Sequence, residues 1–87
     1  NYVQVFYTED GRLKKRILRA TMKKMEEALA GYPQFFRCHR TYIANLDKLE
    51  NVSGNAQGYR LHLAGADETI PVSRNLNETL RARLDEI

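Results

Sequence analysis

Short runs of apolar, aromatic and β-branched residues lie between polar turn signals, a pattern typical of β-strands. At Tyr59–Leu63 apolar residues alternate with Arg60 and His62, as in a strand with one buried face and one solvated face. Near the N-terminus the pattern predicts a hairpin in which Tyr2–Tyr7 and Leu13–Arg19 are joined by a turn at residues 9–11. Further short strands are predicted at Phe36–Cys38, Tyr42–Ala44, Leu49–Val52, Tyr59–Leu63 and Thr69–Val72. Strands therefore dominate the chain.

Two short stretches have the period of an amphipathic helix instead. The first follows Thr21, a favourable N-cap, and its apolar face consists of Met22, Met25 and Leu29. The second has an apolar stripe of Leu76, Leu80, Leu84 and Ile87, and Asn75 and Glu78 are spaced as a capping box at its start. The pattern as a whole predicts a fold that is mainly β with short α-helices.

The composition is that of one small globular domain. The chain has 87 residues, of which 43% are hydrophobic and 29% charged, close to the averages for soluble domains. The longest uncharged apolar run is Leu61–Ala66, far shorter than the roughly 20 residues of a membrane-spanning helix. The single cysteine, Cys38, cannot form an internal disulfide, which favours a reducing cytoplasm.

Positive charge is concentrated in one stretch, residues 12–24, which we call the basic strip. It contains seven of the fourteen basic residues and no acidic residue, although the net charge of the chain is only +3. Such a concentration is typical of phosphate binding. It is equally compatible with a solvated hairpin, so the charge alone leaves both interpretations open.

The sequence contains no arrangement typical of an active site. His39 and His62 are the only histidines and lie 23 positions apart, with no further ligand at the spacing of a zinc site. Cys38 adjoins His39, but neighbouring side chains of a strand point to opposite faces, so a buried structural cysteine is favoured over a nucleophile. No glycine-rich phosphate loop is present. We therefore expect no enzymatic activity, metal or cofactor.

A polar segment, residues 39–41, interrupts two apolar strands. A polar turn between buried strands can project side chains from a rigid support. Arg40 offers a planar fork of donors that matches guanine O6 and N7 or a phosphate. The alternative is a structural corner in which His39 binds buried carbonyls and Arg40 pairs with Asp47 or Glu50. The residues alone leave the two open.

A second polar segment precedes the last predicted helix. Ser73 and Asn75 suit helix capping, and this is the more favoured role for both of them. Arg74 has no capping role and is free to reach outward, toward an anion at the helix start. Two arginines on two turns of a β scaffold, together with the basic strip, form a plausible set for binding a DNA duplex.

Several ordered motifs resemble one known family. Residues 39–45 read His-Arg-Thr-Tyr-Ile-Ala-Asn, the preceding residues 35–37 read Phe-Phe-Arg, and residues 70–74 read Ile-Pro-Val-Ser-Arg. They resemble the LytTR DNA-binding domain, the output module of AlgR/AgrA/LytR-type response regulators, whose core reads His-Arg-Ser-Tyr-Ile-Val-Asn. Residues 1–3 and 21–26 also fit, so the resemblance runs through nearly the whole chain. Thr41 and Ala44 are conservative departures from the family core.

The resemblance implies an elongated fold of three small antiparallel sheets, in which loops enter successive major grooves of double-stranded DNA. Carried over by position, the base-contacting residues are Arg40, Arg74, Asn1 and Tyr2. Phosphate contact or loop support falls to Thr21, Lys23, Lys24, His39, Thr41, Ser73 and Asn75, with His39 holding its loop. The resemblance also implies that residues 1–87 form one DNA-binding domain without the family's additional N-terminal strand. An upstream receiver or sensor region, repeated half-sites and dimerisation through regions outside this chain are further implications.

Two other classes of function remain open at this stage. Exposed β edges could pair with a partner protein, with the basic strip serving an acidic segment. The tyrosines could stack on RNA bases, although no ribonucleoprotein-type aromatic motif is present. Sequence-specific DNA binding in transcriptional regulation is the main hypothesis.

Overall fold

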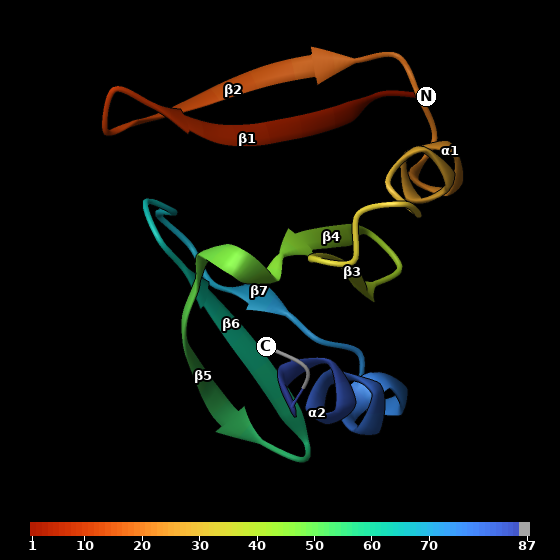
Figure 1. The fold of residues 1–87 in the computed structure, drawn as a ribbon, viewed down its shortest axis with the longest axis vertical. Coiled ribbons are helices and arrows are strands. Elements are labelled where there is room, and N and C mark those ends of the chain that lie inside the picture. Colours follow the sequence, from red (N-terminus) through yellow and green to blue (C-terminus); the bar gives the residue numbers. More distant parts are fainter. Residues whose placement is uncertain (86–87) are drawn as a thin grey trace.

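Three small antiparallel sheets and two short helices make up the computed structural model, which describes residues 1–85 (Figure 1). In chain order the elements are β1 (Val3–Glu9), β2 (Arg12–Leu18), α1 (Met22–Ala28), β3 (Phe35–His39), β4 (Tyr42–Asn45), the 3₁₀ turn η1 (Leu46–Lys48), β5 (Leu49–Asn55), β6 (Gly58–Leu63), β7 (Ile70–Pro71), the 3₁₀ turn η2 (Arg74–Leu76) and α2 (Asn77–Asp85). The mainly β fold with short helices is confirmed. With extents of 32 × 28 × 22 Å, the molecule is only modestly elongated.

The N-terminal hairpin predicted from the sequence is present, with strand bounds that differ by one or two residues. β1 and β2 pair only with each other, in an unbroken antiparallel register from Val3–Leu18 to Glu9–Arg12. The connecting residues, Asp10 and Gly11, both have positive φ angles of 54° and 75°, which match a tight turn that follows the twist of the strands. In Figure 1 this hairpin lies along one side of the molecule.

The second sheet is a short hairpin of β3 and β4 with an irregular register. Phe36 lies opposite Ala44 and His39 opposite Tyr42. Two residues of β3 therefore face one residue of β4, which is the arrangement of a β-bulge. The third sheet has the order β5-β6-β7, and its short last strand leads directly into η2 and α2.

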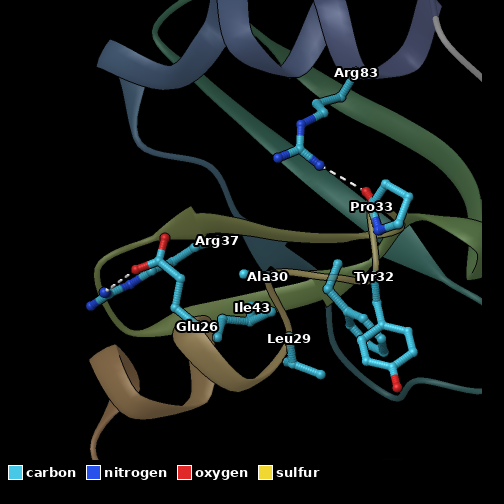
Figure 2. A pocket seen from close by; sticks show the side chains of 9 residues that line it. Glu26, Leu29, Ala30, Tyr32, Pro33, Arg37, Ile43 and Arg83 are labelled. Atoms are coloured by element: carbon cyan, nitrogen blue, oxygen red, sulfur yellow. Dashed lines mark hydrogen bonds and ion pairs between the residues drawn. The ribbon is translucent and has the colours of Figure 1, made fainter.

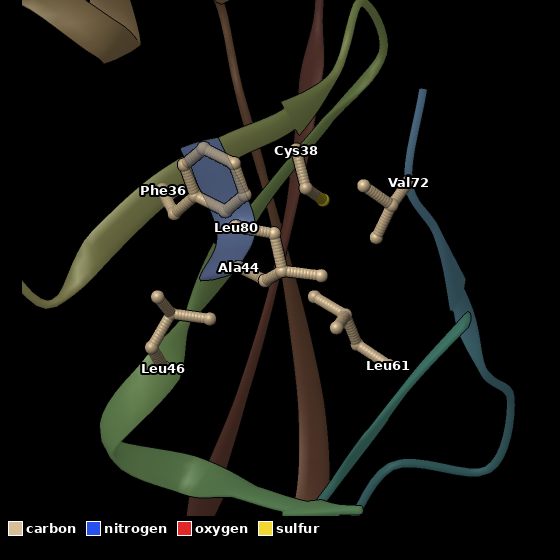
Figure 3. Packing of buried hydrophobic residues seen from close by; sticks show 7 residues of the cluster. All are labelled: Phe36, Cys38, Ala44, Leu46, Leu61, Val72 and Leu80. Carbon is tan, nitrogen blue, oxygen red and sulfur yellow. The ribbon is translucent and has the colours of Figure 1, made fainter. Parts of the chain in front are cut away.

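The hydrophobic core joins the second sheet, the third sheet and α2 (Figure 3). Among the described residues, its buried members are Phe36, Cys38, Ala44, Leu46, Leu61, Val72 and Leu80. Burying a large aliphatic side chain contributes about 1.5–3 kcal/mol, so this cluster supplies much of the stability that holds β3–β4 against β6. None of the core residues comes from β1 or β2.

The last helix begins later than the sequence predicts. Residues Arg74–Leu76 form a 3₁₀ turn, and α2 starts at Asn77. The predicted capping box of Asn75 and Glu78 is wrong, because Asn75 lies inside this turn rather than before the helix. Ser73, at the N-cap of the turn, makes no side-chain capping hydrogen bond, so the capping role favoured for it is also not found.

The apolar stripe of the last helix is otherwise present. Leu80 is buried, and Leu76 and Leu84 pack against the core cluster. Ile87, the fourth predicted member of the stripe, lies outside the described residues. The predicted N-cap of the first helix is confirmed: Thr21 Oγ1 accepts a hydrogen bond from the backbone N–H of Lys24 at 3.1 Å.

Candidate nucleic-acid interface

The basic strip is divided by the geometry of the hairpin that contains most of it. In an antiparallel pair, successive side chains of a strand point to opposite faces of the sheet. Arg12, Lys14 and Arg16 therefore share one face of β1–β2, whereas Lys15 lies on the other. Lys14 also forms an ion pair with Glu9 at 2.7 Å. The strip is thus not one continuous cationic patch.

The remaining cations of the strip include two lysines at the start of α1. Lys23 and Lys24 are exposed there, next to the N-cap residue Thr21. The backbone N–H of Ala20 donates to the carbonyl oxygen of Asn1 at 3.1 Å. This hydrogen bond places the first residues of the chain beside the start of α1, where the side chain of Tyr2 is 72% exposed.

Arg40 lies in the turn between β3 and β4 with its side chain in solvent. Within residues 1–85 its guanidinium makes no ion pair or hydrogen bond with the protein, so the pairing with Asp47 or Glu50 does not occur. His39 Nδ1 accepts from the backbone N–H of Thr41 at 3.2 Å and lies 3.0 Å from Thr41 Oγ1. These contacts fix the shape of the turn from within.

Arg74 lies in η2 and is also exposed. Its Nη1 donates to Gln57 Oε1 over a long 3.4 Å, a weak contact that leaves most of its donors unused. The residue before it, Ser73, donates its backbone N–H to the carbonyl oxygen of Cys38 at 2.8 Å. Because Cys38 is in β3, two residues before Arg40, this hydrogen bond ties the two arginine-bearing turns together.

A half-buried arginine that sequence reasoning did not single out as a site residue connects two of these segments. Arg37 Nη1 donates to Glu26 Oε1 of α1 at 3.0 Å, and Arg37 Nη2 donates to the carbonyl oxygen of Arg40 at 2.7 Å. Figure 2 shows this pair at one end of a shallow depression of about 230 Å³. At the other end Arg83 Nη1 donates to the carbonyl oxygen of Pro33 at 2.8 Å. The sequence signals for Arg37 were its place between two apolar strand positions, which predicts an outward side chain, and its membership of the Phe-Phe-Arg motif at residues 35–37.

Hydrogen bonds therefore link all the predicted contact segments in series. The N-terminus is joined to the start of α1, α1 to β3, the β3–β4 turn to Arg37, and β3 to the residue before η2. In Figure 1 the N-terminus, α1, the β3–β4 turn and the chain entering α2 all lie on the right-hand side of the view. The predicted residues thus belong to one connected part of the fold.

This surface presents donors and positive charge. Arg40, Arg74, Lys23 and Lys24 are exposed cations, and the nearby Glu26 is already paired with Arg37. Lysine and arginine side chains of this kind bind phosphate oxygens, and arginine in addition matches the acceptors of guanine in the major groove. The arrangement suits a polyanion that also presents hydrogen-bond acceptors, to which the arginines can donate.

Catalytic chemistry has no support in the residues that the structure describes. Residues 1–85 contain no cluster of three or more His, Cys, Asp or Glu side chains able to hold a metal ion. Burial raises the pKa of the Cys38 thiol to about 11, so near neutral pH it stays protonated and is a poor nucleophile. No helix within the same residues has the length and apolar character needed to cross a membrane.

Comparisons with known proteins agree on one family. The family model described as the LytTr DNA-binding domain matches residues 1–85. The sensory transduction protein LytT of Oceanobacillus iheyensis is 40% identical over 58 residues, which are 64% of this chain and 23% of that protein. The chain also resembles the LytTr DNA-binding domain of a Bacillus cereus protein described as a methyl-accepting/DNA response regulator. In that comparison the TM-score is 0.69 at 20% identity, over 95% of this chain and 78% of the other.

The fold, the surface and the family model together define a DNA-binding domain built from three small antiparallel sheets and two short helices. The chain belongs to the LytTr DNA-binding domain family. This class is a family of DNA-binding modules and not of enzymes. The stretch matched in the LytT protein is about a quarter of that protein's length.

Proposed function

We propose that the domain reads double-stranded DNA through two turns that enter the major groove, one carrying Arg40 and the other Arg74. The observation that carries the proposal is the pair of exposed guanidinium groups on turns joined by the hydrogen bond from Ser73 to Cys38. An arginine fork makes two parallel hydrogen bonds to guanine O6 and N7. Two such groups held on one rigid scaffold give sequence preference at two positions of the site.

The other predicted residues have supporting roles in this proposal. Lys23 and Lys24 contact phosphates beside the start of α1, and Asn1 and Tyr2 contact bases from the adjoining end of the chain. His39 holds the shape of its turn through Thr41. Phosphate contact or loop support around the two turns and the helix start is assigned to Thr21, Thr41, Ser73 and Asn75. Most of the affinity then comes from phosphates and most of the selectivity from the two arginines.

In its biological setting, we place the domain as the transcription-regulating output of a signalling protein in the cytoplasm. Support comes from the family and from the relative described as a sensory transduction protein. The proposal includes residues 1–87 as one domain, an upstream receiver or sensor region, and two copies of the protein on repeated half-sites. Signal reception would then lie outside the surface described above.

The test of base reading replaces Arg40 or Arg74 by Ala. A preferred duplex is first selected from a random pool with the protein, and affinity is measured for that duplex and for a scrambled one. Each substitution is expected to cost about 1–3 kcal/mol on the preferred duplex, roughly 5- to 150-fold, with little loss on the scrambled one. Arg60→Ala, a loss of an exposed arginine on β6, is the matched control. Equal losses on both duplexes would contradict the reading role.

Phosphate contact is tested through the dependence of affinity on salt. Lys23→Gln or Lys24→Gln is expected to weaken all duplexes alike, and to flatten the slope of log affinity against log salt concentration by about one. Lys14→Gln, on β2 and already paired with Glu9, is the control that keeps the net charge of the variants equal. A lysine whose replacement leaves the slope unaltered is not at the interface.

Protein interaction is a second candidate function, and one observation favours it. Phe6 and Ile17 are 59% and 58% exposed and share one face of the β1–β2 hairpin, together with Lys15. Such a face could bind an acidic partner with apolar side chains. Parallel titrations with duplex DNA, single-stranded RNA and an acidic peptide separate the candidates. Only the DNA proposal predicts that the duplex binds more tightly than the RNA and the peptide, with an affinity that depends on salt.

A further inference from the structure

Arg37 occupies a distinctive position in the short second sheet. It lies between the buried residues Phe36 and Cys38, in the part of β3 where the register with β4 shifts. Its side chain therefore leaves the core and turns along the outside of the sheet, with 27% of its surface exposed. There it meets α1 on one side and the β3–β4 turn on the other (Figure 2).

The two hydrogen bonds of Arg37 use different nitrogens of one rigid group. Nη1 binds the carboxylate of Glu26 at 3.0 Å, and Nη2 binds the carbonyl oxygen of Arg40 at 2.7 Å. Because the guanidinium is planar and its nitrogens are fixed relative to one another, the two acceptors are held at a set separation. A flexible ammonium, which concentrates its donors at one point, cannot bridge them in the same way.

The contribution of this bridge to stability is small. Glu26 is 53% exposed, and an ion pair in such surroundings is worth between about zero and 1 kcal/mol. The bond to Arg40 is different in kind, because it is short, charge-assisted and made to the backbone of the turn itself. What the bridge changes most is the freedom of the turn relative to α1.

We propose that Arg37 is a positioning residue for DNA reading. It clamps the turn that carries Arg40 against α1, which begins with Lys23 and Lys24. The base-reading arginine and the phosphate-binding lysines are then held in fixed positions relative to one another when the duplex binds. The entropy of the turn is lost when the protein folds rather than when it binds DNA. The inference rests on the proposed function, since it assigns to Arg37 an effect on selectivity exerted through Arg40.

The central test replaces Arg37 by Lys, which keeps the charge but not the bridge. The ratio of affinities for the selected and scrambled duplexes is expected to fall about tenfold. A change of this size corresponds to the cost of ordering one side chain or turn on binding. The salt slope and the midpoint of urea unfolding are expected to stay close to those of the unmodified protein. Glu26→Gln retains an oxygen acceptor for Nη1 and is expected to keep most of the selectivity.

The matched control is Arg60→Lys. Arg60 is an exposed arginine that also makes two hydrogen bonds across a turn, from Nε to Thr69 Oγ1 at 2.6 Å and from Nη2 to the Thr69 carbonyl oxygen at 3.5 Å. The chemical change is the same, but Arg60 holds the residue before β7 rather than either of the arginine-bearing turns. We expect no change in selectivity from this variant.

A second readout does not require DNA. Hydrogen exchange at the backbone amide of Thr41 reports opening of the turn, and it is expected to be several-fold faster in Arg37→Lys than in the unmodified protein or in Arg60→Lys. Unchanged exchange together with unchanged selectivity would overturn the proposal. A salt slope that falls by about one would also overturn it, because Arg37 would then be a phosphate contact.

The two proposals fail in different ways. If the unmodified protein selects no duplex at all, the proposed function fails, and the assignment of Arg37 to DNA reading fails with it. If the unmodified protein selects a duplex and Arg37→Lys selects it equally well, only the positioning role fails. A fall in selectivity with equal stability and an equal salt slope supports both.

Discussion

The buried thiol of Cys38 gives the stability of the domain a specific dependence on alkaline pH. Its side chain is fully buried in the core, and Sγ lies 3.9 Å from the carbonyl oxygen of Tyr42. Burial disfavours the thiolate and raises the pKa of Cys38 from 9.0 to about 11. The unfolded chain therefore loses this proton at lower pH than the folded one. The stabilising effect is complete below pH 9 and is lost as the pH rises toward 11.

The size of the loss follows from the two pKa values. At about pH 10, midway between the two pKa values, most of the unfolded chains have lost the thiol proton and most of the folded ones have kept it. The free energy of unfolding is therefore lower there by about 1.4 kcal/mol than at about pH 8. Urea unfolding under reducing conditions at these two pH values measures it. Lysines and tyrosines also titrate in this range, so the quantity of interest is the difference between the unmodified protein and Cys38→Ala. If both proteins lose the same stability, the thiol is not the cause.

Three further predictions concern the parts of the fold that support the interface. Leu61→Ala, at a fully buried position of β6, is expected to lower the free energy of unfolding by about 2–5 kcal/mol in urea titrations; a loss below 1 kcal/mol would mean that the core closes around the gap. Thr21→Ala removes the N-cap of α1 and should cost about 1 kcal/mol, whereas Thr21→Ser should cost little. Gly54→Ala places a methyl group against the carbonyl oxygen of Gly58 at a φ of +85°, and we expect a loss of about 1–3 kcal/mol, measured as a lowered melting temperature; Gly58→Ala, with open space around its Cβ, is its control.

The strands and the first helix could be predicted because their signals are local. Short apolar, aromatic and β-branched runs between turn residues indicated the strands, Asp10-Gly11 indicated a tight turn, and Thr21 indicated the start of α1. The start of α2 could not be predicted in the same way. A 3₁₀ turn and an α-helix begin with similar residues, and here the backbone of Ser73 is already bonded to Cys38 of another sheet, which fixes where the chain leaves β7.

The candidate site could be predicted only in part, for a similar reason. Exposure of Arg40 and Arg74 followed from polar segments between apolar ones. The bridge made by Arg37 did not, because its partner Glu26 is 11 residues away and is met only when α1 packs beside β3. The basic strip, by contrast, suggested more than the structure contains. Its charges are close together in the sequence, but those on β2 are divided between the two faces of the sheet because successive side chains of a strand point to opposite faces.

The β-bulge in the second sheet constrains how the chain can change in length. Between the pairs Phe36–Ala44 and His39–Tyr42, β3 has one residue more than β4. Deleting Arg37, one of the two β3 residues between these pairs, would turn the Cys38 thiol to the solvent side and the imidazole of His39 inward, because side chains of a strand alternate between faces. Related chains are therefore expected to vary in length at the exposed residues 65–68, and to keep the spacing from 36 to 44 without insertions or deletions.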